Sequence, residues 1–403
     1  MGVGLTRVAP PTDALIINTR PGVSADAISK PASQGVFVTL HGVRGIAAIA
    51  VVAWHEPELP CPTFQPASGY LAVDLFFVLS GLVLAHAYDA RFARGLSAGR
   101  FMIGRLIRLY PLYLVGLVLN SVGLLVAFSL HTHTNWTLAE FAVASGLSLF
   151  FIPSPPMHST TIFPLNGPAW SLFFELVANL AFALIWKRLT IPVLAVIIAV
   201  AALLLIGADI QHGSLDVGSN WPTFWGGLPR VIYSFFVGVV LGRAQGTSLP
   251  RPTINPWLII LAVAIVLSVQ PGAWRAEYDL GCVLILLPLL VWAGASVEPR
   301  GTTAVFFTAL GASSYAMYAV HVPLLTMAAK GLGPQIASFG AASAVIFLVA
   351  MVGVGLLLDR VDGPVRARLN RLVARAYNRR RRDEYREPER QNYKVEAGKY
   401  DQR

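Results

Sequence analysis

Apolar residues dominate long stretches of this chain, and short polar segments separate them. A transmembrane helix needs about 20 predominantly apolar residues, and most of the stretches approach or exceed that length. Because they recur along the chain, they predict one helical membrane domain rather than several small soluble domains. Eleven stretches qualify, near residues 36–54, 69–88, 109–130, 138–152, 168–186, 191–207, 222–242, 256–270, 280–297, 303–329 and 335–358.

The distribution of Lys and Arg tests whether all eleven stretches cross the membrane, because cytoplasmic loops carry an excess of these residues. Segment 91–108 contains five arginines and is predicted to be cytoplasmic, whereas loop 56–68 contains no Lys or Arg and is predicted to lie outside. Lys187 and Arg188 follow the fifth stretch and favour an inside location. These requirements agree if the short stretch 138–152 does not cross. We therefore predict an all-α integral membrane protein with about ten transmembrane helices, a re-entrant or interfacial segment at 138–152, and both termini in the cytoplasm.

Composition agrees with this class: 55% of the residues are hydrophobic and 13% are charged, against about 25% charged in soluble proteins. Residues 1–35 form a polar segment without the apolar region of a signal peptide, and we expect it in the cytoplasm. The membrane domain spans 36–358. Much of the net charge of +10 comes from the basic tail 359–403, which we expect to be disordered or to lie on anionic lipid rather than to bind nucleic acid.

Cysteine content and motif spacing limit the cofactors that the sequence predicts. Cys61 and Cys282 are both expected near the outer face, which leaves a disulfide open as an alternative, although two cysteines do not make a disulfide framework. The sequence contains no metal-ligand spacing and no glycine-rich phosphate loop. We therefore expect no bound metal and no permanently bound cofactor.

Several ionisable residues fall inside the predicted membrane helices, where a charge near the bilayer centre costs about 2.5–3.5 kcal/mol. Arg44 and His55 are eleven residues apart in one stretch, so they share a helix face and are separated along the axis by about 16 Å. The predicted topology separates the ionisable residues into two levels. The outer level contains histidines and acids, namely His55, Asp74, Glu175 and His321. The inner level contains arginines, namely Arg44, Arg105 and Arg108.

These residue types have a chemical interpretation. A histidine beside a carboxylate can act as a general base toward a hydroxyl, because the carboxylate fixes the tautomer and orientation of the ring. Two arginines one turn apart at a cytoplasmic helix end are suited to phosphate. A donor with phosphates inside and a reactive group outside would match both levels. The residues leave two alternatives open: structural ion pairs for Arg44, Asp74, Glu175 and Arg230, and anchoring of helix ends for Arg105 and Arg108.

Five sequence blocks resemble the acyltransferase-3 family of bacterial membrane proteins, in the order found in that family. The first contains an arginine, a ten-residue gap and a histidine, Arg44 and His55. One departure is His41, where the family usually has an aspartate. The blocks are Leu40–Ala48 with its extension to His55, Gly69–Gly81, Arg105–Tyr113, Pro168–Glu175 and Ser314–Pro323.

The resemblance implies transfer of an acyl group, commonly acetyl, from acyl-coenzyme A on the cytoplasmic side to a hydroxyl of an extracytoplasmic glycan, glycolipid or glycoside. It implies a multi-pass protein of the bacterial inner membrane, in the stand-alone form without an appended esterase-type domain. By resemblance, His55 is the essential histidine, Arg44 is its motif partner, and Arg105 and Arg108 lie near the donor. We predict His55, Asp74 and Glu175 as the catalytic residues, with Asp74 or Glu175 orienting the ring of His55, and Arg44, Arg105 and Arg108 as the donor-binding residues. Other site candidates are His321, Tyr315, Arg230 and Trp170.

Two other classes of function stay open from the residues alone. A transporter or flippase could use the same intramembrane charges as a relay or ion site, although no internal repeat supports inverted halves. An acyltransferase of another class is less favoured, because no histidine here is followed by an aspartate in the spacing His-x-x-x-x-Asp. The sequence does not indicate which glycan is acylated or how long the acyl chain is.

Overall fold

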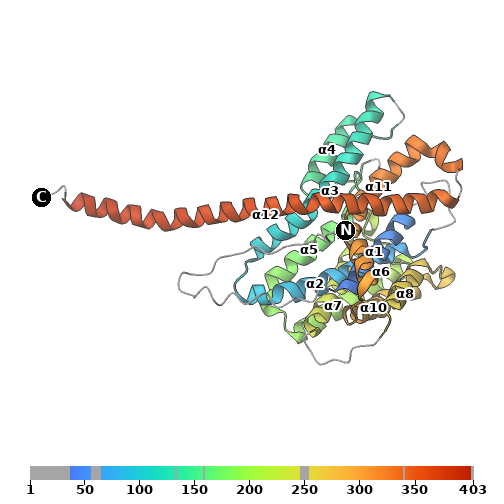
Figure 1. Cartoon of the computed structure of the whole chain (residues 1–403), viewed down its shortest axis with the longest axis horizontal. Coiled ribbons are helices and arrows are strands. Elements are labelled where there is room, and N and C mark those ends of the chain that lie inside the picture. Colours follow the sequence, from blue (N-terminus) through green and yellow to red (C-terminus); the bar gives the residue numbers. More distant parts are fainter. Residues whose placement is uncertain are drawn as a thin grey trace, which may run out of the picture. The chain divides into compact units, whose positions relative to one another are not determined.

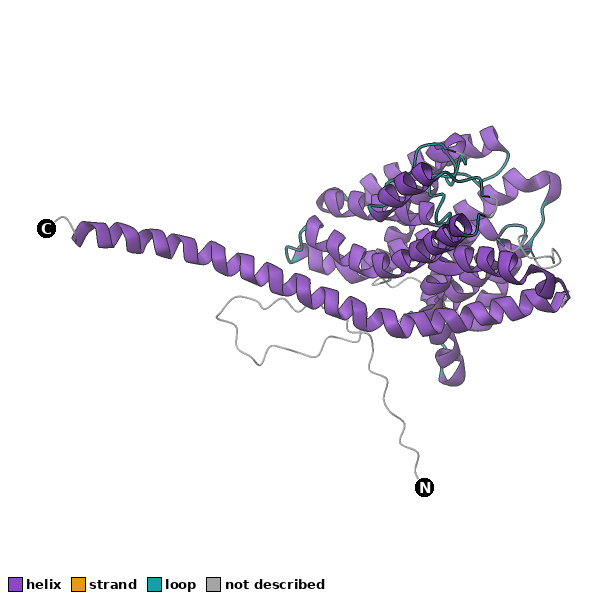
Figure 2. Ribbon diagram, turned by 90° about the horizontal axis from the view of Figure 1, so that it is seen from above, coloured by secondary structure: helices purple, strands orange, loops and turns teal. Residues whose placement is uncertain are grey.

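The structure is a computed structural model of the 403-residue chain, and it consists of helices and connecting loops (Figure 1). It describes residues 37–55, 65–131, 134–157, 159–245, 254–338 and 341–400. Within these ranges no β-strand forms (Figure 2), and the one β-bridge joins Thr161 to Asn220. The chain divides into two compact units, one of residues 35–359 and the other of residues 1–34 with 360–403. The larger unit contains the predicted membrane domain.

Twelve α-helices are described, and the first seven run from the start of the membrane domain to its middle. These are α1 Val38–Trp54, α2 Ala72–Ala93, α3 Ala98–Ser129, α4 Leu138–Leu149, α5 Ala169–Ile185, α6 Ile191–His212 and α7 Phe224–Ala244. The other five are α8 Pro256–Ser268, α9 Arg275–Gly281, α10 Leu287–Ala295, α11 Gly301–Ser338 and α12 Ala341–Tyr400. Residues Cys282–Leu286 connect α9 to α10 as a π-helical turn.

The helices confirm the predicted fold class. Eight helical segments of the described chain are long and apolar enough to cross a membrane, and α1, α4 and α8 are shorter apolar helices. The eight together with α1 and α8 make ten, the number that the charge distribution predicts. Helix α4 has 12 residues, a length of about 18 Å against a hydrocarbon core of about 30 Å. It is the segment predicted not to cross.

Local signals explain where two of these helices begin. Ser97 accepts a hydrogen bond from the backbone N–H of Arg100 and caps α3, so α3 starts eleven residues before the apolar stretch 109–130. Thr137 and Glu140 form a capping box at the start of α4, which satisfies two backbone donors of its first turn. The early start of α3 puts Arg105 and Arg108 inside a helix rather than at its end.

The basic tail was predicted to be disordered or to lie on the membrane surface. The structure continues α12 as helix to Tyr400, and in the smaller unit Arg366 pairs with Asp362 one turn earlier, at 2.7 Å between Nε and Oδ2. The expectation of a disordered or membrane-surface tail stays a prediction, and residues 1–36 lie outside the described residues.

Missing side chains let the helices of the larger unit approach closely. A Cβ on Gly238 of α7 would lie 2.1 Å from the carbonyl oxygen of Val78 on α2. A Cβ on Gly45 of α1 would lie 2.5 Å from the Cβ of Leu310 on α11, and one on Gly116 of α3 would lie 2.2 Å from the carbonyl oxygen of Ala319. The contacts of Gly45 and Gly116 hold α1 and α3 against α11, and this arrangement positions the ionisable residues.

Candidate active site

Two histidines meet at the end of α1. His55 is the residue that follows α1, and its Nδ1 lies 3.2 Å from Nε2 of His321 on α11. The same Nδ1 lies 2.9 Å from the carbonyl oxygen of Val51, and Nδ1 of His321 lies 2.9 Å from the carbonyl oxygen of Tyr318. His321 is fully buried, and His55 is partly exposed. The two histidines that the sequence assigns to one level are therefore in direct contact.

Arg44 and His55 lie three turns apart on α1, and both contact α11. Its Nη2 donates to the carbonyl oxygen of Gly311 at 2.7 Å, and its Nε donates to Oγ of Ser314 at 3.1 Å. Gly311, Ser314 and His321 are spaced three and seven residues apart on α11, which places them along one helix face. The regular rise per residue of an α-helix places Arg44 about 16 Å from His55 along the axis of α1. One face of α11 thus contacts α1 both at its C-terminal end and near its middle.

Glu175 does not lie at a level separate from the arginines, and this part of the prediction is wrong. Its Oε1 lies 2.6 Å from Nη2 of Arg105, and it also accepts a hydrogen bond from Oγ of Ser80 at 2.6 Å. The physical reason is the early start of α3, because Arg105 lies two turns inside that helix and so reaches the middle of α5. Arg105 is buried and Glu175 nearly so.

Asp74 pairs with Arg230. Its two carboxylate oxygens accept from Nε and Nη2 of Arg230 at 3.2 and 2.6 Å, and neither side chain is exposed. Arg230 also donates to the carbonyl oxygens of Val217 and Tyr70 and lies 5.3 Å from the ring of Trp170. This arrangement matches the structural ion pair that the sequence left open. In the described part of the chain neither Asp74 nor Glu175 hydrogen-bonds to His55.

Two hydroxyl groups that the sequence did not single out lie next to the histidine pair. The Tyr318 hydroxyl is 2.6 Å from Oγ of Ser171 on α5, and the Tyr318 ring lies 5.8 Å from the ring of His321. Ser171 and Glu175 are one helical turn apart, so they share a face of α5. Tyr318 thus connects the turn of α11 before His321 to the turn of α5 before Glu175. The signal was present as the spacings Tyr318–His321 and Ser171–Glu175, which match helical periodicity.

Tyr315 also lies on α11, but its hydroxyl contacts α3 rather than α5. Its hydroxyl donates to the carbonyl oxygen of Leu109, the residue after Arg108. This bond attaches α11 to the first half of α3. The sequence-predicted candidate Tyr315 thus contacts backbone beside the predicted donor arginines rather than the histidine pair.

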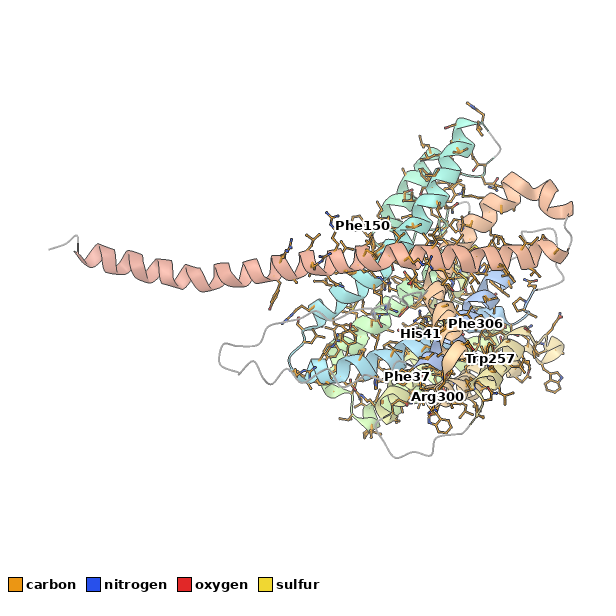
Figure 3. The ribbon with its side chains drawn as sticks, viewed as in Figure 1. Phe37, His41, Phe150, Trp257, Arg300 and Phe306 are labelled. Carbon is orange, nitrogen blue, oxygen red and sulfur yellow. The ribbon has the colours of Figure 1, made fainter. Side chains whose placement is uncertain are left out.

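His41 lies at the start of α1, near the inner arginines. Arg44 follows it by three residues on α1, and among the described residues its Nδ1 is buried without a hydrogen-bond partner. A Cβ on Gly311 would lie 2.5 Å from the Cβ of His41, so the ring packs against α11. Figure 3 labels His41 of α1 and Phe37, the residue before that helix, together with Phe306 and Trp257, whose rings stack at 5.6 Å.

The described residues offer no group of three His, Cys, Asp or Glu side chains that could hold a metal ion. Cys282 is a buried free thiol, and Cys61 lies outside the described residues, so the disulfide alternative has no structural test.

Comparison with known proteins identifies the family. A family model described as an acyltransferase domain, that of the acyltransferase-3 family, matches residues 37–360. The chain belongs to the acyltransferase-3 family. The match covers all of the larger unit's described helices that carry the site. The recognition made from the five sequence blocks is therefore confirmed, and the chain is a multi-pass membrane acyltransferase by family.

Individual relatives show similarity over different shares of the chain. It is 38% identical over 184 residues to "Protein 2 in picA locus" of Rhizobium radiobacter, covering 43% of this chain and 95% of that protein. It is 29% identical over 374 residues to the acyltransferase MdmB of Streptomyces mycarofaciens, covering 83% and 92%. It is 23% identical over 330 residues to the peptidoglycan O-acetyltransferase OatA of Listeria monocytogenes, covering 73% and 50%. No solved structure matches the chain significantly.

Proposed function

We propose that this protein moves an acyl group, commonly acetyl, from acyl-coenzyme A on the cytoplasmic side to a hydroxyl of an extracytoplasmic glycan, glycolipid or glycoside. The protein would lie in a bacterial inner membrane with both termini in the cytoplasm. The observation that carries the proposal is the contact of His55 with His321 inside the family domain, at the end of the helix that also carries Arg44.

The reaction needs a base for the acceptor hydroxyl, and His55 is the partly exposed member of the histidine pair. His55 takes the hydroxyl proton while the hydroxyl oxygen attacks the thioester carbonyl carbon. The carbon–sulfur bond breaks, and the departing thiolate takes the proton from His55 to leave as the free thiol. Transient transfer of the acyl group to His55 before the acceptor arrives is the second route that this residue permits.

Arginines of α1 and α3 support recognition of the phosphates of coenzyme A. Arg44 binds the carbonyl oxygen of Gly311, and Tyr315, one turn further along α11, donates to the carbonyl oxygen of Leu109, the residue after Arg108, so α11 contacts both arginine-bearing segments. Arginine is suited to phosphate because its planar guanidinium presents several donors in a fixed geometry. Arg105 is held by Glu175, and we assign it to fixing α3 beside this region as well as to the donor site.

The first experiment identifies the acceptor and the acyl group. Mass spectrometry of envelope glycans from a strain that lacks the protein should show an acyl group missing from one class of glycan. Restoring the wild-type protein should restore that mass, and restoring His55→Ala should not. His212→Gln is a matched control, because His212 is an exposed histidine at the end of α6. Full acylation with His55→Ala would contradict the proposal.

A transporter or flippase that uses the same charges predicts a different result. Purified protein in liposomes would then move the glycan without consuming thioester. Consumption of acetyl-coenzyme A that depends on both the glycan and His55 would exclude this alternative. Glycan movement at an unchanged thioester concentration would replace the proposed acyl transfer by transport.

A further inference from the structure

Backbone carbonyls fix the position of the protons on the buried histidine. A carbonyl oxygen only accepts hydrogen bonds, so Nδ1 of His321, at 2.9 Å from the carbonyl oxygen of Tyr318, carries the proton. A fully buried ring without a carboxylate partner is held neutral, because an unpaired charge is costly in an apolar interior. A neutral imidazole has one N–H. Nε2 of His321 therefore presents a lone pair to His55.

The same argument about donors and acceptors determines which nitrogen of His55 carries the proton. Its Nδ1 faces two acceptors, the carbonyl oxygen of Val51 at 2.9 Å and Nε2 of His321 at 3.2 Å. The N–H must therefore be on Nδ1, where the two acceptors share it, because an unprotonated Nδ1 would place lone pairs against both of them. Nε2 of His55 is then the unprotonated nitrogen of the neutral ring.

From this geometry we infer that Nε2 of His55 is the reactive nitrogen and that His321 is the residue that positions it. The inference rests on the proposed function and deepens it. When Nε2 takes the proton of the acceptor hydroxyl, His55 becomes a cation. Its Nδ1–H bond to His321 then becomes charge-assisted and stronger. His321 acts through His55, so it is a positioning residue rather than a catalytic one.

A histidine thus fills the role that the sequence assigned to a carboxylate. Asp74 is held by Arg230 and Glu175 by Arg105. The partner of His55 is a neutral acceptor whose own proton is fixed by the Tyr318 carbonyl. This partner stabilises the His55 cation less strongly than a carboxylate would, and it lets the proton pass on readily to the departing thiolate.

Two substitutions of His321 separate positioning from simple packing. His321→Leu keeps an apolar side chain in the buried space but removes the acceptor, so Nδ1 of His55 loses its side-chain partner. We expect kcat to fall by about 100-fold, the lower range of the contribution of a general base, with KM for acetyl-coenzyme A and for the glycan within about 2-fold of wild type. His321→Gln places an amide oxygen near the position of Nε2, and we expect it to recover about tenfold of that loss.

The measurement uses purified full-length protein in liposomes, with acetyl-coenzyme A as donor and glycan extract from the deletion strain as acceptor. Met317→Leu is the matched control, because Met317 is also fully buried on α11, one turn from His321, and the substitution nearly conserves volume. Thermal unfolding establishes that each variant is folded. If His321→Leu does not fold, the comparison of His321→Gln with wild type and with Met317→Leu decides.

The outcomes distinguish this inference from the proposed function. Wild-type protein that does not transfer the acyl group, or that transfers it without His55, removes the proposed function itself. Active wild type with an unchanged kcat in folded His321→Leu overturns the positioning role alone. A folded His321→Gln as inactive as His321→Leu also overturns it, because an acceptor at that position would then be insufficient. Recovery by Gln with unchanged KM values supports it.

Discussion

Glu175 of α5 and Arg105 of α3 form an ion pair inside the membrane domain, with 2.6 Å between Oε1 and Nη2. Both side chains are largely shielded from solvent, and removal of one partner from a buried pair leaves an uncompensated charge. We expect Glu175→Ala to lower the free energy of unfolding by about 3–5 kcal/mol. Thermal unfolding of the purified protein measures this loss.

A double substitution tests whether the pair, rather than the space it fills, accounts for the loss. Replacing both Glu175 and Arg105 by Met removes the charges while keeping apolar volume, and such replacements of buried pairs are often neutral or stabilising. The double variant should therefore unfold closer to wild type than Glu175→Ala does. If it is less stable than the single variant, the ion pair is not the origin of the effect.

The Asp74–Arg230 pair leads to a prediction about role. Both side chains are fully buried and bind each other through two hydrogen bonds, so we expect Asp74→Asn to cost about 3–5 kcal/mol of stability. The fraction that stays folded should keep kcat within a few-fold of wild type, because Asp74 does not hydrogen-bond to His55 in the described structure. A folded variant that loses its acyl transfer completely would return Asp74 to the list of catalytic candidates.

His41 provides a test of the donor site. A carboxylate at this position would lie one turn before Arg44 on α1 and against Gly311, whose carbonyl oxygen Arg44 binds, and it would compete with donor phosphates for this arginine. His41→Asp should therefore raise KM for acetyl-coenzyme A by about tenfold, equivalent to about 1.4 kcal/mol, while His41→Asn should change it little. Acetyl-pantetheine lacks the nucleotide phosphates, so its KM should be the same in both variants. An equal increase with both donors would argue against phosphate recognition here.

The sequence was sufficient to predict the class of fold. Long apolar stretches are strong signals for membrane helices, and the basic segment after residue 90 together with Lys187 and Arg188 predicts that stretch 138–152, which contains the short helix α4, does not cross. Helix starts were less predictable. The stretch 109–130 was recognised by hydropathy, whereas the Ser97 cap that begins α3 is polar and escaped that criterion.

The pairing of side chains could not be predicted because it depends on how each helix is rotated about its axis. Helices that are apolar all round carry little periodic signal for rotation. The rotation of α1 against α11 is set instead by close contacts, such as Gly45 against Leu310, and it turns both His55 and His321 toward each other. The sequence predicted two histidines at one level, and only the packing of α1 on α11 makes them a pair.

The contact between α2 and α7 gives a last prediction, about packing alone. A Cβ on Gly238 would lie 2.1 Å from the Val78 carbonyl oxygen, and a backbone atom cannot move aside as a flexible side chain can. We expect Gly238→Ala to force the two helices apart and to lower the free energy of unfolding by about 1–3 kcal/mol or more. Gly146 of α4 is the control, because a Cβ there meets nothing within 4 Å. Gly146→Ala should be neutral or stabilising by about 0.5–1 kcal/mol, since alanine is the better helix former. Thermal unfolding of both variants measures the difference, and equal unfolding temperatures would show that the α2–α7 contact tolerates a wider separation than its backbone geometry implies.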